Sequence, residues 1–206
     1  MHSNFEPIKK IYQDEHILMS IDSMRYFNEA IEAAGSTALV FGDVLNIMNI
    51  KRIVQATHEA GKKAFIDMDL VRGIDNDISA VRFLVNEVKA DCLITRHRNI
   101  IIDAQSHIWC VWKTFLYDIL SLNTAISNIE KCRPYAIDII PGISFPFVYQ
   151  RLRSITDAYI GIAGFYNETE ESLHSLIQNG VDVIYTRNRS LWKGLPAESA
   201  QLPLNE

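Results

Sequence analysis

Short runs of β-forming residues alternate with longer helical patterns along the sequence, and this alternation restricts the fold more than any other feature. Most of the β-forming runs are almost continuously apolar, which is typical of parallel strands buried on both faces. The pattern predicts strands at residues 16–21, 37–41, 64–68, 91–95, 109–117, 135–140, 159–163 and 181–186.

A helical pattern follows each predicted strand. The predicted helices span residues 24–34, 49–60, 78–88, 99–106, 124–132, 147–155, 169–179 and 190–193. Eight strand–helix units fit a single α/β domain with the (β/α)8 architecture of a TIM-type barrel, whose usual length is about 200–250 residues. An open doubly wound sheet is the alternative, because alternation by itself does not show that the sheet closes.

The 206 residues leave little room for anything beyond these eight units. No proline-rich or glycine-rich linker divides the chain, so we expect one barrel domain over residues 1–206. Within it, residues 195–206 resemble a loose tail. With 48% hydrophobic and 22% charged residues, the composition excludes a disordered chain, a collagen-like fibre and a coiled coil.

The charge balance limits the partners. Twenty basic and 25 acidic residues give a formal net charge of −5, which excludes a surface that is basic all over and coats nucleic acid. A local basic patch remains compatible with this balance. No secretory signal and no membrane span are visible, and the three cysteines (Cys92, Cys110 and Cys132) lack metal-ligand spacing. We therefore expect a reduced cytoplasmic protein with no membrane partner and no metal.

In a parallel barrel, functional residues gather on the loops that follow the strands. The last two such loops contain Ala163-Gly164-Phe165 and Thr186-Arg187-Asn188. Glycine lets backbone N–H groups approach an anion closely, Thr186 can donate a hydrogen bond, and Arg187 can add a charge-assisted one. These residues predict a phosphate site, although a strand end that needs a tight turn explains Gly164 equally well.

Lys113 interrupts an apolar strand. A lysine that faces a barrel interior can form a Schiff base or bind an anion, and it can also extend to the rim and pair with Asp138 or Asp69. We favour an anion or carboxylate partner. No second lysine, Ser–His pair or Cys–His pair falls on neighbouring rim positions, so we expect no catalytic residues and no enzyme.

Asp67 and Asp69 are two residues apart on one predicted strand, so their side chains should point the same way. Two such carboxylates could bind a divalent metal or act in acid–base catalysis. Alternatively, one caps the following loop and the other pairs with Lys113, and we favour this second interpretation.

The rim residues resemble a known family, the glycerol uptake operon antiterminators. The resemblance covers almost the whole chain in the right order and rests on these segments: Gly42-Asp43-Val44, Ala60-Gly61-Lys62-Lys63, Asp69-Leu70-Val71-Arg72-Gly73-Ile74, Ile94-Thr95-Arg96, Phe115-Leu116-Tyr117-Asp118, Pro141-Gly142-Ile143, Ala163-Gly164-Phe165 and Leu191-Trp192. It implies a (β/α)8-type fold, sensing of glycerol 3-phosphate, and action on leader messenger RNA to prevent transcription termination.

Carried over position by position, the resemblance implies a ligand pocket at Asp69, Thr95, Arg96, Lys113, Asp138, Gly164 and Thr186, to which the phosphate argument adds Arg187. This chain departs from the family pattern at four positions. It has Asp22 where a basic residue is common, Asp67 in place of histidine, Ala163 in place of glycine, and Arg187 in place of a small hydroxyl residue. The two aspartates remove positive charge near the presumed ligand, and Arg187 restores some of it.

The leading hypothesis is therefore a regulator of glycerol metabolism that needs no cofactor, binds a small phosphoester and acts on leader mRNA. We expect RNA contacts at Arg96, Arg98, Arg187 and Arg189, because two rim loops contribute them and the net charge confines RNA to a basic patch. A homodimer through an exposed apolar helix face is a further expectation.

Two alternatives stay open. The first is a phosphate-binding barrel enzyme, a lyase or isomerase acting on a triose phosphate-like substrate. In that enzyme Asp67 or Asp69 would be the base and Lys113 the electrophile. The second is a regulator of protein partners whose pocket is vestigial.

Overall fold

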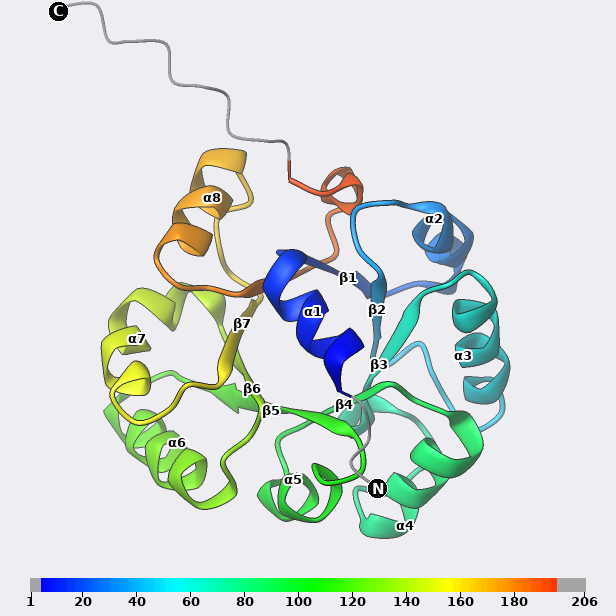
Figure 1. Ribbon diagram of the computed structural model, residues 1–206, viewed down its shortest axis with the longest axis horizontal. Coiled ribbons are helices and arrows are strands. Elements are labelled where there is room, and N and C mark those ends of the chain that lie inside the picture. Colours follow the sequence, from blue (N-terminus) through cyan, green and yellow to red (C-terminus); the bar gives the residue numbers. More distant parts are fainter. Residues whose placement is uncertain (1–4, 196–206) are drawn as a thin grey trace, which may run out of the picture.

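The computed structural model describes residues 5–195 and has a closed barrel of eight parallel strands (Figure 1). The strands follow one another around the ring in chain order, and β8 pairs with β1 to close it. The predicted (β/α)8 barrel is confirmed, and the open sheet is wrong because no strand is left at an edge. The strands are β1 (Ile17–Ile21), β2 (Ala38–Phe41), β3 (Lys63–Asp67), β4 (Cys92–Thr95), β5 (Trp109–Phe115), β6 (Ala136–Ile140), β7 (Tyr159–Ala163) and β8 (Val183–Thr186).

Helices surround the barrel on the outside (Figure 1). The α-helices that follow strands are α2 (Phe27–Glu32), α3 (Ile50–Glu59), α4 (Ile78–Phe83), α5 (Arg98–Ala104), α6 (Ile119–Cys132), α7 (Phe145–Arg153) and α8 (Glu170–Gln178). Short 3-10 helices complete the connections: η1 (Met24–Tyr26), η2 (Met68–Leu70), η4 (Gly142–Ser144) and η5 (Arg189–Lys193). A π-helical turn, η3 (Leu84–Val88), extends α4.

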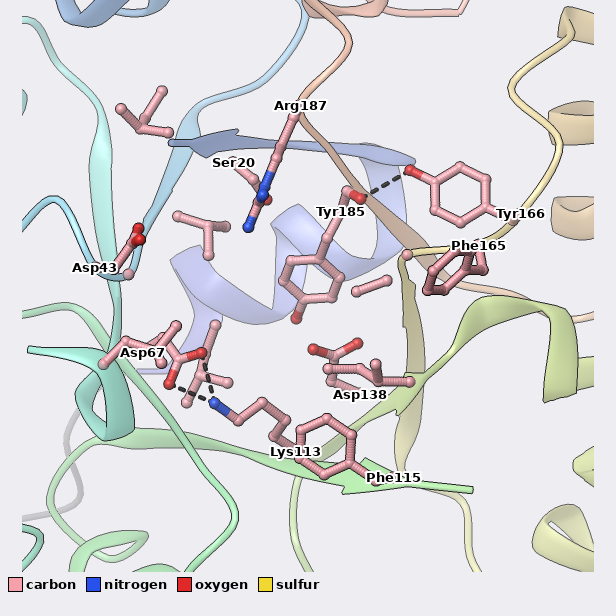
Figure 2. A pocket seen from close by; sticks show the side chains of 18 of the residues that line it. Ser20, Asp43, Asp67, Lys113, Phe115, Asp138, Phe165, Tyr166, Tyr185 and Arg187 are labelled. Carbon is pink, nitrogen blue, oxygen red and sulfur yellow. Dashed lines mark hydrogen bonds and ion pairs between the residues drawn. The ribbon is translucent and has the colours of Figure 1, made fainter. Parts of the chain in front are cut away.

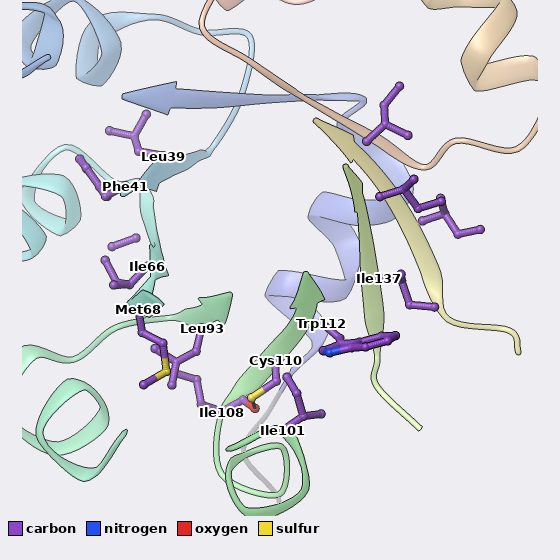
Figure 3. Packing of buried hydrophobic residues seen from close by; sticks show 14 of the residues in the cluster. Leu39, Phe41, Ile66, Met68, Leu93, Ile101, Ile108, Cys110, Trp112 and Ile137 are labelled. Carbon is purple, nitrogen blue, oxygen red and sulfur yellow. Dashed lines mark hydrogen bonds between the residues drawn. The ribbon is translucent and has the colours of Figure 1, made fainter. Parts of the chain in front are cut away.

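Strand periodicity divides the core into an outer and an inner layer, because successive side chains of a strand point to opposite faces. On β5, Cys110 and Trp112 point outward and pack with the helices, as Figure 3 shows for Cys110 beside Ile101 of α5. Trp109 and Val111 belong to the inner layer, and Lys113 continues that face. The inner layer becomes polar toward the carboxyl ends of the strands, where it opens into a cavity.

A helix that the sequence pattern did not predict, α1 (Glu6–Asp14), lies across the amino-terminal end of the barrel (Figure 1). Its buried residues Ile8, Ile11 and Tyr12 join the inner layer and pack with Trp109. The Tyr12 hydroxyl lies 2.9 Å from the hydroxyl of Tyr185. The spacing of Ile8, Ile11 and Tyr12 is that of an amphipathic helix, a signal that lies before the first predicted strand–helix unit.

Helix α6 begins at Ile119, five residues before its predicted start at residue 124. Asp118 caps it: the Asp118 carboxylate accepts a hydrogen bond from the backbone N–H of Ser121, and the Ser121 hydroxyl accepts one from the N–H of Asp118. This reciprocal capping box ends the preceding strand at Phe115 and starts the helix early.

Leu195 packs against the outer hydrophobic layer. The rest of the expected loose tail, residues 196–206, lies outside the described residues. Among the helices of residues 5–195, none has the length and apolar character needed to cross a bilayer.

Candidate functional site

A cavity of about 460 Å³ opens at the carboxyl-terminal ends of the strands (Figure 2). Every strand of the barrel contributes to its wall, because the inward-facing residues near all eight strand ends converge there. The side chains that matter for its chemistry are Ser20, Asp43, Asp67, Lys113, Asp138, Phe165, Glu168, Tyr185 and Arg187.

Lys113 forms a buried ion-pair cluster on one wall of this cavity. Its Nζ lies 2.6 Å from each carboxylate oxygen of Asp67 and 3.2 Å from Oδ2 of Asp69. The lysine is only 6% exposed. Burial raises the pKa of Asp67, and the Lys113 ammonium opposes that rise. Two carboxylates thus compensate the single positive charge of Lys113.

This cluster decides between the interpretations of the two aspartates. Asp67 ends β3 and Asp69 lies in η2, so they are not on one strand, yet both reach Lys113. The following loop is capped by Asp77, whose carboxylate accepts a hydrogen bond from the N–H of Ala80 at the start of α4. Both Asp67 oxygens face the ammonium, so the expected pairing of one aspartate with Lys113 is confirmed, whereas the capping carboxylate in the following loop is that of Asp77.

Asp138 lies beside this cluster without joining it. It is opposite Lys113 in the register of β5 and β6 and is 4% exposed, but no side chain or backbone group of the described residues donates a hydrogen bond to it. Burial, and then the negative charge of Asp67, raise the pKa of Asp138 to about 7, while Lys113 opposes the rise. Of the two partners expected for Lys113, Asp69 is confirmed and Asp138 is not; Asp67 is a further and closer partner.

The turn after β7 forms another part of the rim. Gly164 and Phe165 both have positive φ angles, 64° and 51°, and both line the cavity. A Cβ on Gly164 would meet no atom within 4 Å, so the backbone conformation, and not lack of space, explains the glycine. Phe165 adopts the same strained conformation with its ring 85% exposed. Strain at a cavity rim is a common property of ligand sites.

The turn after β8 binds a carboxylate of the chain itself, that of Glu168. The Thr186 hydroxyl donates to Oε1 of Glu168 at 3.2 Å, and the Asn188 side-chain amide donates to Oε2 at 3.0 Å. Thr186 itself is buried and does not line the cavity, whereas Glu168 does. The Thr186 hydroxyl, which we expected to donate to a phosphate, therefore donates to Glu168 instead.

Three residues expected in the pocket form a separate network behind its wall. The Thr95 hydroxyl donates to Oδ1 of Asp69 at 2.6 Å, and the backbone N–H of Arg96 donates to Oδ2 at 3.0 Å. None of the three lines the cavity. Asp69 thus ties the end of β4 to η2 and touches the site only through Lys113.

The four arginines expected to contact RNA differ in their surroundings. Arg187 is exposed, lines the cavity and has no acidic partner among the described residues. The Arg96 side chain is exposed as well. Arg98 is half-buried and donates to Asn128, and Arg189 pairs with Glu29 at 2.8 Å. Since β4 and β8 lie opposite each other in the ring of strands, Arg96 and Arg187 are on opposite sides of the mouth.

The structure thus brings together four of the predicted ligand residues, Lys113, Asp138, Gly164 and Arg187, and leaves Asp69, Thr95, Arg96 and Thr186 outside the cavity wall. It also adds lining residues that were not predicted as ligand residues, notably Ser20, Asp43, Glu168 and Tyr185. Strand periodicity could have identified Ser20 and Tyr185, which share the inward face of their strands. Glu168 follows no periodic signal because it lies in a loop.

A family model and a known relative each match most of the chain. The model of the glycerol-3-phosphate responsive antiterminator family matches residues 17–192. The uncharacterized protein YgcP of Escherichia coli K12 is 28% identical over 171 residues, which cover 80% of this chain and 87% of YgcP.

Two solved structures share the fold over most of the chain. The glycerol uptake operon antiterminator regulatory protein of Listeria monocytogenes has a TM-score of 0.81 at 26% identity, covering 88% of this chain and 97% of that one. The glycerol uptake operon antiterminator-related protein of Thermotoga maritima has a TM-score of 0.75 at 27% identity, covering 87% and 98%.

Proposed function

Because the chain belongs to the glycerol-3-phosphate responsive antiterminator family, we propose that it is a cytoplasmic regulator that binds a small phosphoester at the barrel mouth. In the liganded state it acts on the leader mRNA of glycerol-utilisation genes and prevents termination. The family name makes glycerol 3-phosphate the effector to test. The proposed ligand binding rests on one observation: Arg187 is an exposed cation that lines the cavity and has no acidic partner in residues 5–195.

The phosphate group fits best between the two last rim turns. Arg187 supplies a charge-assisted hydrogen bond, and the turn at Gly164 and Phe165 borders the same space. Lys113 is a weaker candidate for this end, because Asp67 and Asp69 already surround its ammonium. A phosphate at the Thr186 hydroxyl would displace the carboxylate of Glu168.

We place the RNA at the same rim because two exposed arginines, Arg96 and Arg187, lie there. With a net charge of −5, the chain repels a polyanion except where basic side chains gather. Arg96 and Arg187 lie on opposite sides of the mouth, so an RNA strand that contacts both passes over the ligand. The bound ligand then forms part of the surface that the RNA contacts, which couples the two binding events.

A homodimer remains a prediction, and its surface is the apolar one beside the mouth. Tyr117, Ile119 and Phe147 border one small cavity between the starts of α6 and α7, and all three are exposed, as is Leu120.

An enzyme of the lyase or isomerase class is the second candidate. The specific observation in its favour is the buried Asp138, whose pKa of about 7 suits a general base, next to the Lys113 cation. Replacing Lys113 with alanine abolishes turnover if the protein is such an enzyme. If Lys113 only supports the ligand pocket, RNA binding without ligand survives.

The deciding experiment measures binding of a labelled leader transcript by fluorescence anisotropy, with and without glycerol 3-phosphate. We expect tighter binding with the ligand and a steep loss of affinity with salt, at a slope set by the phosphates neutralised. In a parallel thermal-shift series, glycerol 3-phosphate at about one hundred times its Kd should stabilise the protein by about 2.7 kcal/mol.

Arg187→Ala should weaken both ligand and RNA binding. Lys131→Ala, which removes an exposed cation in the last turn of α6, at the opposite end of the barrel from the mouth, is the control and should change neither. No RNA binding in either state would refute the antiterminator proposal. Stabilisation by another phosphoester but not by glycerol 3-phosphate would refute only the assigned effector.

A further inference from the structure

Asp69 lies behind the cavity wall and connects the cavity to the turn after β4, which consists of residues 96 and 97. Its Oδ2 atom lies 3.2 Å from the ammonium of Lys113, which lines the cavity. On its other side, Oδ1 accepts a hydrogen bond from the Thr95 hydroxyl and Oδ2 accepts one from the backbone N–H of Arg96. The Asp69 side chain is only 6% exposed, so solvent screens these contacts little.

A histidine in the same turn lacks a hydrogen bond that it could make. His97 Nε2 is buried, has no hydrogen-bond partner in residues 5–195, and lies 3.8 Å from Oδ1 of Asp69. Folded proteins pair almost all buried polar side-chain atoms, so this exception beside a carboxylate indicates a second arrangement in which His97 donates to Asp69. Because Asp69 is also bonded to Thr95 and Arg96, closing the gap moves the turn.

Lys113 competes with His97 for Asp69. The Lys113 ammonium has three N–H bonds, and its closest acceptors are the two oxygens of Asp67, at 2.6 Å each, and Oδ2 of Asp69, at 3.2 Å (Figure 2). The longest of these contacts is the weakest. A ligand oxygen that reaches the floor of the cavity therefore displaces Asp69 from Lys113 before it displaces Asp67. Asp69 then loses its cation, and its charge attracts the imidazole N–H of His97.

We propose that Asp69 is a positioning residue that couples occupancy of the cavity to the position of the turn after β4. Without ligand it pairs with Lys113. With ligand it pairs with His97 and moves the turn that carries Arg96. This inference rests on the function proposed above and adds a route of regulation to it. The route differs from direct contact between ligand and RNA, because it changes the turn before any RNA is present.

Trp112 provides a readout that needs no RNA. Its indole N–H donates to the backbone carbonyl of Arg96 at 3.3 Å, and its ring belongs to the outer layer of the core, so a ligand in the cavity does not contact it (Figure 3). In NMR spectra of the whole chain with isotope-labelled tryptophan, saturation with glycerol 3-phosphate should shift the Trp112 indole resonance. Trp109, which packs against α1 at the other end of the barrel, is the internal control and should not shift.

His97→Leu removes the donor without changing a residue of the cavity wall. This variant should bind glycerol 3-phosphate in calorimetry within about fivefold of the wild type, the range of one hydrogen bond. The Trp112 shift should be lost, and the ligand-induced gain in RNA affinity should fall by about the same factor. His97→Gln, whose side-chain amide can donate to Asp69, should restore part of both effects. His107→Leu, at an exposed histidine beyond the far end of α5, is the matched control and should behave like the wild type.

A second arm of the experiment needs no ligand. Lys113→Met combined with Asp67→Asn takes the ammonium away from Asp69, so the Trp112 resonance should move in the direction seen on ligand binding. Adding His97→Leu should cancel this movement. A Trp112 resonance that moves equally with and without His97 would overturn the role of Asp69.

The outcomes separate this inference from the proposed function. Binding of glycerol 3-phosphate to the wild type with no Trp112 shift, or with a shift that survives His97→Leu, would overturn the role of Asp69 and leave the sensor in place. If glycerol 3-phosphate does not bind, the proposed effector fails. In that case an unmoved Trp112 resonance in the ligand-free arm overturns the coupling as well, whereas a movement that depends on His97 supports it with a different ligand.

Discussion

Replacing Asp138 with asparagine should change the pH dependence of stability in a way that can be calculated from its burial. The pKa of Asp138 rises from the ordinary 3.8 to about 7 in the folded chain. At about 1.4 kcal/mol per pKa unit, ionising this carboxyl in the folded chain costs about 4 kcal/mol more than ionising it in the unfolded chain.

The sign follows from proton binding. Between the unfolded pKa and the folded pKa, the folded chain keeps the Asp138 proton and the unfolded chain releases it. The free energy of unfolding therefore falls as pH rises across this window, and the loss is complete above the folded pKa. Asparagine does not titrate. Relative to the wild type, Asp138→Asn should thus gain about 2 to 3 kcal/mol between about pH 5 and about pH 8.

Urea denaturation followed by tryptophan fluorescence measures this directly, because Trp109, Trp112 and Trp192 are buried. The buried amide of asparagine adds an offset that does not depend on pH, so the change between the two pH values is the quantity to compare. Asp43→Asn, at an exposed position, should show no such change. A constant stability difference for Asp138→Asn would mean that Asp138 has a hydrogen-bond donor in the folded protein, and the argument would be wrong.

Three further perturbations probe the same rim. Glu168→Gln should tighten phosphoester binding several-fold in calorimetry, since its carboxylate no longer competes for Thr186; unchanged affinity would contradict this. Lys113→Met should reduce the free energy of unfolding by about 3–5 kcal/mol, because Asp67 loses its buried cation, and adding Asp67→Asn should recover part of the loss. Phe165→Gly should raise stability by about 1 kcal/mol in urea denaturation, since it relieves the left-handed backbone and removes few contacts; a loss would show that the exposed ring packs on something.

Much of the barrel follows from local pattern, because each strand carries its own signal. The inward face of β5 is an example: Lys113 stands out in an apolar run, and its position on the face shared with Trp109 and Val111 places it inside the barrel. The amino-terminal helix and the early start of α6 carry weaker but readable signals, the amphipathic spacing of Ile8, Ile11 and Tyr12 and the helix-capping Asp118, which the strand–helix alternation does not include.

The site was harder to predict than the fold, because it depends on which side chains meet. Thr95 and Thr186 end their strands as expected, but each hydroxyl donates to a carboxylate, Asp69 or Glu168, that the fold brings alongside it. Asp67 lies closer to Lys113 than Asp69 does, because Asp67 still belongs to β3 whereas Asp69 lies in η2. Distances between loops of different strands are not encoded in any local pattern.

Helix α1 has a kinetic consequence. Because it closes the amino-terminal end of the barrel with Ile8, Ile11 and Tyr12, a molecule in the cavity can exchange with solvent only at the opposite end. An RNA strand lying over that opening would hold the effector inside until the RNA dissociates. The effector's release rate would then be set by the lifetime of the protein–RNA complex, and a brief fall in metabolite concentration would not reverse a transcription decision already under way.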